Sequence, residues 1–173
     1  MTEFLNPQQL INQLDIKQGM KIADFGCGSG NITIALARLV GSDGEIIAID
    51  VQKSALESVK SRAVLENLSN IKLTRANLET ANSSQLDDKS VDIVLLANIL
   101  FQSPNQKAII REAERVVRKN GRIIIVDWQP DAKFGPKTPY RTSKEEIRKI
   151  VSLNFEKEIP AGDYHFGLIF KKL

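Results

Sequence analysis

Two aspartates lie at the ends of two apolar segments near the start of the chain. Asp24 opens the run Asp24-Phe25-Gly26-Cys27-Gly28-Ser29-Gly30, and Asp50 closes the segment 45–50. The glycines permit a tight turn and let a ligand approach the backbone closely, and the N–H groups that open the next helix can face that ligand. A carboxylate at Asp50 can accept hydrogen bonds from both hydroxyls of a ribose. The pattern predicts a nucleoside site.

The glycine spacing separates two kinds of nucleoside cofactor. A dinucleotide-binding loop spaces its glycines Gly-x-Gly-x-x-Gly, whereas this loop reads Gly-x-Gly-x-Gly with Asp24 just ahead of it. Asp24 would repel a pyrophosphate. Spacing and charge therefore disfavour a nicotinamide dinucleotide at this loop.

The run from Asp24 to Gly30 resembles motif I of the class I methyltransferases that use S-adenosylmethionine (SAM), and 91–98 resembles their motif IV. The resemblance covers nearly the whole chain and is closest to the ubiquinone/menaquinone methyltransferase group. It implies that Asp24 helps to position the methionyl amino group and that Asn98 lies beside the methionyl end of SAM and the methyl acceptor. An asparagine that caps the loop after the strand is the alternative for Asn98. SAM would be the cofactor and S-adenosylhomocysteine (SAH) the product.

Further cofactor contacts follow from the resemblance. Val51 stands where an apolar side chain can cover the adenine, and Asn77 and Leu78 follow the third strand, where the family often places an acid that accepts from the adenine amino group. The Asn77 oxygen can accept the same bond without a charge; an ordinary loop residue is the alternative. No metal site is expected. The predicted cofactor residues are Asp24, Gly26, Cys27, Gly28, Gly30, Asp50, Val51, Asn77, Leu78 and Asn98.

Asp127 and His165 are the candidates for catalysis. In methyl transfer from a sulfonium, alignment of the acceptor supplies about 7–11 kcal/mol, and a general base adds about 10²–10⁴-fold when the acceptor loses a proton. Asp127 ends a predicted strand, and His165 is the only histidine. The segment 128–142, with three aromatic residues, is predicted to line the acceptor site. A surface connection and a structural histidine are the alternatives.

The elements that must position these residues alternate along the chain. Apolar runs and helical patterns follow one another, which predicts an α/β fold with helices on both faces of the sheet. The connection 160–163 lets the last two strands pair only antiparallel. We expect a Rossmann-like seven-stranded sheet with six parallel strands and one antiparallel C-terminal strand. The predicted strands are 21–25, 45–50, 71–75, 91–97, 122–127, 154–159 and 164–171.

Helices are predicted over 7–14, 31–40 and 53–66, and two more begin at capping boxes. Ser103 would cap the first of these two, with Pro104 at its first position and Gln106 completing the box, and Asn120-Gly121 would end it. Ser143 would cap the second. The face of the helix 31–40 that is expected to pack on the core carries Ile32, Ala35, Leu36 and Leu39.

The composition is typical of one globular domain. The chain has 173 residues, 42% hydrophobic and 26% charged, and we expect 1–173 to form a single domain with a short helical segment over 1–18. No apolar run is long enough to cross a bilayer, and the N-terminus lacks the pattern of a secretion signal, so we expect a cytoplasmic protein. A single cysteine, Cys27, excludes an internal disulfide and a cysteine-based metal cage.

The charge pattern leaves two interpretations open. A net charge of +3 is too small to imply a polyanionic partner, but basic residues cluster at Arg111, Arg115, Arg118, Lys119 and Arg122. A solvated helix face and a nucleic-acid patch both fit this cluster.

We predict an enzyme that methylates O, C or N of a small acceptor. A SAM-binding module without catalysis and a nucleic-acid methyltransferase are the alternatives. The run Asn98-Ile99-Leu100-Phe101 lacks the Asn/Asp-Pro-Pro-aromatic pattern of enzymes that methylate nucleobase amino groups. A homodimer that covers the cleft is plausible, because methyl transfer benefits from the exclusion of water.

Overall fold

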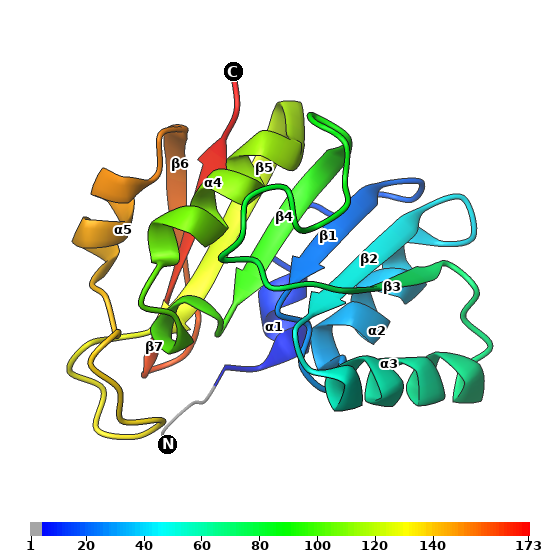
Figure 1. Cartoon of the computed structure of the whole chain (residues 1–173), viewed down its shortest axis with the longest axis horizontal. Coiled ribbons are helices and arrows are strands. Elements are labelled where there is room, and N and C mark those ends of the chain that lie inside the picture. The colour runs from blue at the N-terminus through cyan, green and yellow to red at the C-terminus, as the bar shows by residue number, and fades with distance from the viewer. Residues whose placement is uncertain (1–4) are drawn as a thin grey trace.

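The computed structural model describes residues 5–173 and contains one seven-stranded sheet (Figure 1). Its order is β3-β2-β1-β4-β5-β7-β6, and only β7 runs against the others. The predicted α/β fold with six parallel strands and one antiparallel strand is therefore confirmed. The strands are β1 (Lys21–Phe25), β2 (Glu45–Asp50), β3 (Ile71–Arg75), β4 (Val91–Ala97), β5 (Val117–Trp128), β6 (Asn154–Ile159) and β7 (His165–Lys171).

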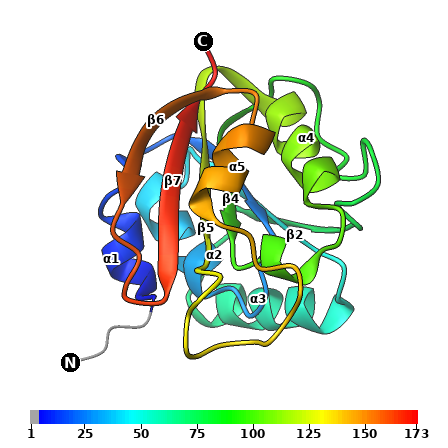
Figure 2. The same ribbon diagram turned by 90° about the vertical axis from the view of Figure 1, so that its left-hand side faces the viewer.

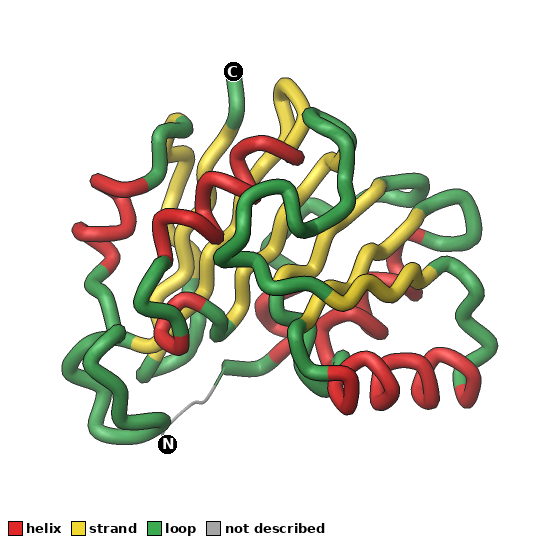
Figure 3. The backbone as a smooth tube through the Cα atoms, viewed as in Figure 1, coloured by secondary structure: helices red, strands yellow, loops and turns green. Residues whose placement is uncertain are grey.

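Helices cover both faces of the sheet (Figure 2). The first three pack on one face, and α4 and α5 pack on the other. Long loops join β3 to β4 and β5 to α5 (Figure 3). No helix within residues 5–173 is long and apolar enough to cross a membrane. The helices are α1 (Pro7–Ile11), α2 (Asn31–Val40), α3 (Lys53–Leu65), the 3-10 helix η1 (Leu100–Gln102), α4 (Gln106–Val116) and α5 (Lys144–Ile150).

The helix in the N-terminal segment is shorter than predicted. The predicted helix over 7–14 ends at Ile11, although Leu14 is still buried in the core. Asn6 caps this helix by accepting from the backbone N–H groups of Gln8 and Gln9. The first four residues of the expected segment 1–18 lie outside the described residues.

The predicted core face of α2 is wrong by part of a turn. Leu39 is 41% exposed, and Thr33 is fully buried. Apolar periodicity does not count a threonine as a core residue, but the Thr33 hydroxyl donates to Asp24 on β1 and is thereby satisfied. The residues of α2 that are buried are Thr33, Ile34, Leu36, Ala37 and Val40.

The predicted capping box at Ser103 does not form, and α4 begins three residues later, at Gln106. The Ser103 hydroxyl donates to Glu79, and the Gln106 amide donates to the carbonyls of Leu100 and Tyr140. The Gln106 side chain is thus held by partners outside its own helix, and the Ser103 hydroxyl oxygen accepts from the Asn105 N–H instead of the Gln106 N–H that a capping box requires. The second predicted box, between Ser143 and Glu146, is confirmed.

The end of α4 also differs from the prediction. The helix stops at Val116, and β5 starts at Val117, so the strand begins before the predicted residue 122. Val117 pairs with Val91, and the register with β4 then shifts before Ile93. Pairing with the neighbouring strand replaces the last helical turn, and Asn120-Gly121 lies inside β5 instead of ending a helix.

Candidate functional site

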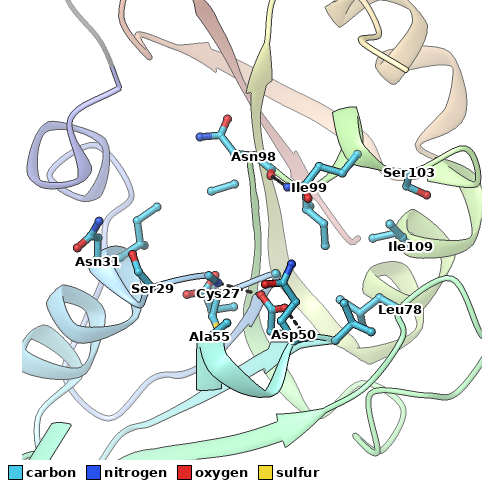
Figure 4. Close-up of a pocket in the computed structure, with 18 of the residues that line it drawn as sticks. Cys27, Ser29, Asn31, Asp50, Ala55, Leu78, Asn98, Ile99, Ser103 and Ile109 are labelled. Atoms are coloured by element: carbon cyan, nitrogen blue, oxygen red, sulfur yellow. Dashed lines mark hydrogen bonds between the residues drawn. The ribbon is translucent and has the colours of Figure 1, made fainter. Parts of the chain in front are cut away.

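A cavity of about 630 Å³ opens at the edge of the sheet where β1, β2, β4 and β5 end and β7 begins (Figure 4). Its volume is in the range of small-molecule sites. Of the ten residues predicted to bind the cofactor, all except Gly30 line it. Gly30 faces α3 instead, since a Cβ built on it would lie 2.7 Å from Val59.

The glycine loop is fastened to β2 through its own amides. The N–H groups of Gly26 and Cys27 both donate to the Ile49 carbonyl, at 2.8 and 3.1 Å. The Gly28 N–H donates to Asp50, and that of Gly30 to the Cys27 carbonyl. These four amides are therefore occupied within the protein. Beyond the glycines, Asn31 and Ile32 at the start of α2 also line the cavity.

The Asp50 carboxylate is held by two backbone amides. One oxygen accepts from the Gly28 N–H at 3.0 Å, and the other accepts from the Gln52 N–H at 2.9 Å. A carboxylate has about four lone-pair sites, so each oxygen can still accept a second hydrogen bond. Val51, 54% exposed, adds an apolar surface beside it. The arrangement suits a ribose and its base.

Asp24 lies buried in the wall of the cavity, 2% exposed. The Thr33 hydroxyl donates to its Oδ2 atom at 2.6 Å. Burial raises the pKa of Asp24 to about 6, against the lowering effect of the Thr33 hydrogen bond, and the nearby charge of Asp50 raises this pKa further. A cation beside Asp24 would stabilise its charged form.

The cavity is electronegative. Three carboxylates line it, from Asp24, Asp50 and Glu79, and among the described residues no lysine or arginine does. A site of this charge disfavours a pyrophosphate and favours a ligand that carries positive charge. Sequence reasoning missed Glu79, because the loop 76–90 carries no pattern that predicts its path.

The turn after β3 forms one wall of the cavity. The Asn77 side-chain oxygen accepts from the Glu79 N–H at 3.0 Å, and the Glu79 carboxylate accepts from the Ser103 hydroxyl at 2.6 Å. Asn77 thus already shapes the turn, in addition to lining the cavity. Leu78 and Ile109 supply buried apolar side chains on this wall.

Asn98 follows β4 and takes a left-handed backbone conformation, with φ at 56°. Its N–H donates to the Val126 carbonyl, and its own carbonyl accepts from the Gln102 side chain. The side-chain Oδ1 atom is buried and has no hydrogen-bond partner within the described part of the chain. Figure 4 shows Asn98 and Asp50 on different walls of the same space.

The Asp127 carboxylate points away from the cavity. Residues alternate between the faces of a strand, and Asp127, 4% exposed, turns to the face of α4. One of its oxygens accepts from the N–H groups of Leu100 and Phe101 in η1, and the other accepts from the Trp128 N–H. Burial raises its pKa to about 6, although these three amides lower it. Asp127 is not among the residues that line the cavity.

Trp128 and His165 do line it, at the end opposite Asp50. They are register partners on β5 and β7, and their ring centroids lie 4.0 Å apart. His165 is 3% exposed, and neither ring nitrogen has a partner in residues 5–173. Burial, aided by the charge of Arg141, lowers the pKa of His165 to about 4. Its imidazole is therefore neutral near pH 7.

The predicted acceptor loop 128–142 brings one of its three aromatic residues to the cavity, Trp128. Phe134 packs against Tyr164 with ring centroids 5.2 Å apart. The Tyr140 carbonyl accepts from Gln106. Arg141 fastens the loop by donating to the carbonyls at 132 and 134, and its guanidinium carbon lies 5.4 Å from the centre of the Trp128 ring.

The basic cluster is largely neutralised by ion pairs. Arg115 pairs with Glu112 and Asp88, Arg118 pairs with Asp92, and Arg122 pairs with Glu156. Paired guanidinium groups contribute little net charge toward a phosphate backbone. The structure gives the nucleic-acid alternative no support here.

Comparison with known proteins identifies a family. The family model described as a methyltransferase domain matches residues 16–163. A demethylmenaquinone methyltransferase of Staphylococcus aureus is 29% identical over 120 residues, which cover 69% of this chain and 48% of that protein. The protein of the same name from Bacillus cytotoxicus is 28% identical over 159 residues, covering 92% of this chain and 60% of its own. The chain thus spans about half the length of these relatives.

Solved structures show the same fold. A SAM-dependent methyltransferase from Aquifex aeolicus superposes with a TM-score of 0.86 at 22% identity, and the match covers 98% of this chain and 91% of that one. At this identity the likeness establishes the Rossmann-like fold, and the family match carries the assignment of the domain.

Proposed function

We propose that this chain, which belongs to the methyltransferase domain family and uses SAM as its cofactor, methylates a small aromatic acceptor at the β5–β7 end of its cavity. The charge of the cavity is the observation that carries the proposal. Three carboxylates line the cavity, and among the described residues no lysine or arginine does. SAM carries a positively charged sulfur and an ammonium group, so this lining suits it. A pyrophosphate-bearing cofactor would meet repulsion.

The cofactor residues would act along the sheet edge in the order of the strands. Asp50 on β2 would accept from the ribose hydroxyls, with its oxygens already oriented by the Gly28 and Gln52 amides. Val51 would cover the adenine. Asp24 on β1 would hold the ammonium group, which favours the charged form of this buried acid. Asn98 would then lie at the methyl group, at the end of the adjacent strand β4.

The acceptor would lie beyond Asn98, beside Trp128. When bound, the cofactor supplies a methyl group on a sulfonium, which needs no protein group to activate it. The main task of the protein is alignment, and alignment supplies about 7–11 kcal/mol. We assign Asp127 to positioning, because its carboxylate holds the amides of η1, which follows Asn98. The relatives named for demethylmenaquinone, a quinone, support an aromatic acceptor.

A SAM-binding module without catalysis remains the second candidate. This candidate predicts that the bound cofactor alone satisfies the hydrogen-bonding groups that line the cavity. Hydrogen-bonding atoms of Asn98 and His165 that have no partner in the described part of the chain favour an enzyme with a second ligand.

Transfer of a tritiated methyl group from SAM tests the proposal. The purified chain is incubated with a panel of phenols, naphthols and reduced quinones, and with a small-molecule extract. We expect labelled product with at least one aromatic compound, and none with a chain carrying Asp50→Ala. The matched control is Asp43→Ala, an exposed residue in the turn before β2, which should keep full activity. Tight SAH binding without any labelled product would contradict the enzyme and favour the silent module.

A further inference from the structure

Unsatisfied polar atoms concentrate at the acceptor end of the cavity. Six buried side-chain polar atoms lack a hydrogen-bond partner within residues 5–173, and three of them belong to Asn98 and His165. An unpaired buried polar group destabilises the folded protein. Both residues line the cavity, so a ligand bound there can supply the missing partners.

The two residues stand on either side of the end of β5. Asn98 lies on the β4 side, where its N–H bonds the Val126 carbonyl. His165 lies on the β7 side, as the register partner of Trp128. Trp128, at the end of β5, therefore lies between the strands that lead to Asn98 and to His165, and all three residues line one cavity.

The chemistry of these groups specifies what they can bind. The Asn98 Oδ1 atom only accepts hydrogen bonds, and a neutral imidazole accepts at one nitrogen and donates at the other. Two acceptor positions around an aromatic side chain suit a planar ring that carries O–H groups. A ligand with ether or methyl groups in those places cannot donate, so it would leave the two accepting protein atoms unpaired.

We propose that Asn98 and His165 recognise a hydroxyl-bearing aromatic acceptor, a phenol or hydroquinone, through hydrogen bonds from its hydroxyl groups beside Trp128. This inference rests on the proposed function, since it names the substrate class of the same site. His165 then acts as an uncharged hydrogen-bonding residue for the acceptor. Its burial and the neighbouring Arg141 keep the ring neutral, and the Asp127 carboxylate on the adjoining residue of β5 is turned to the opposite face.

The chain offers one histidine and one tryptophan, which makes the test specific. With ¹⁵N-labelled histidine, every imidazole signal in an NMR spectrum reports on His165. The SAH-bound protein is titrated with 2-naphthol and with 2-methoxynaphthalene, which has the same ring system but no O–H group. We expect 2-naphthol to shift the imidazole resonances and to bind up to about tenfold more tightly, the effect of one net hydrogen bond.

Variants separate recognition from structural support. His165→Leu should reduce the affinity ratio of the two ligands to about one, and His165→Gln, which keeps a donor and an acceptor, should restore part of it. Asn98→Gly, which tolerates the positive φ, should also lower the ratio. Affinity for SAH, measured by calorimetry, should stay within about twofold in the two His165 variants, because we assign His165 to the acceptor.

Two outcomes overturn the inference, and they are distinguishable. If SAH binds normally but wild-type protein shows no preference for 2-naphthol and no imidazole shift, the recognition of hydroxyl groups is wrong and the proposed function stands. If SAH does not bind to wild-type protein, the proposed function fails and this inference fails with it. Should His165→Leu not fold, the wild-type titration and Asn98→Gly still decide the matter.

Discussion

The two ends of the cavity are built differently. At the β1–β2 end, Asp50 is held by two backbone amides and Asp24 by the Thr33 hydroxyl. At the β4–β7 end, the Asn98 oxygen and both His165 nitrogens have no partner in the described chain. Groups held by the protein itself are oriented before a ligand arrives, which is the property that a fixed cofactor requires. Groups without a partner can obtain one from a ligand, so we expect this end to set the choice of acceptor.

The largest expected effect removes the best-oriented group at the cofactor end. Asp50→Ala deletes the carboxylate that we assign to the ribose, and charge-assisted hydrogen bonds contribute about 1.5–3 kcal/mol each. Loss of two such bonds should weaken SAH binding by about 100-fold or more, measured by calorimetry. Asp43→Ala should bind within twofold of wild type. Equal affinities in the two variants, with both folded, would remove the distinction between the two ends.

The next largest effect concerns Asp24, the buried acid at the same end of the cavity. The folded-state pKa of Asp24 is raised from 3.8 to about 6, chiefly by burial. The folded state therefore binds the proton of Asp24 more tightly than the unfolded state does. The resulting stability is fully present below the unfolded-state pKa and is lost as pH rises through the folded-state pKa. Asp24→Asn removes this dependence. From pH 4 to pH 8 the variant should therefore gain roughly 3 kcal/mol in free energy of unfolding relative to wild type, at about 1.4 kcal/mol per pKa unit.

Urea unfolding of both proteins across this range provides the measurement. Thr33→Val gives a second reading, because its hydroxyl lowers the pKa of Asp24, and its loss should extend the pH dependence upward. Parallel curves of unfolding free energy against pH for wild type and Asp24→Asn would show that burial does not shift the pKa of Asp24.

The smallest expected effect concerns Asp127, which lies next to Trp128 on β5 but does not line the cavity. Asp127→Asn keeps one oxygen to accept from the amides of η1 and removes the charge. If Asp127 only positions η1, kcat should fall by less than about tenfold, whereas loss of a general base costs about 10²–10⁴-fold. Stability should fall by about 1–3 kcal/mol, because buried amides lose an acceptor. A drop in kcat of a thousandfold in a stable variant would restore Asp127 as the proton acceptor.

The cofactor end is the half that sequence could predict, because its signals are local. Asp24, the glycines and Asp50 stand at strand ends that the apolar runs define, and β1, β2 and β4 have their predicted bounds. The family match agrees with the methyltransferase class that these motifs predict. Thr33 escaped notice because its burial depends on a partner on another element.

The acceptor end depends on contacts that no short pattern encodes. The side chains of Ser103 and Gln106 fit a capping box, yet the Ser103 oxygen accepts from the Asn105 N–H, and the Gln106 amide donates to a carbonyl on a distant loop. The direction of Asp127 follows from the position of η1, which was not predicted. Glu79 reaches the cavity through a loop without periodicity. The directions of the strands, by contrast, follow from alternation and connection length, so the parallel and antiparallel parts of the sheet were predictable although the loops above it were not.

The account depends most directly on where the nucleoside lies. A crystal structure of the chain with SAH measures this without reference to activity. We predict the ribose hydroxyls on Asp50, the adenine against Val51 and the amino group beside Asp24, with free space left between Asn98, Trp128 and His165. A nucleoside bound elsewhere, or one whose ribose makes no contact with Asp50, would contradict the account.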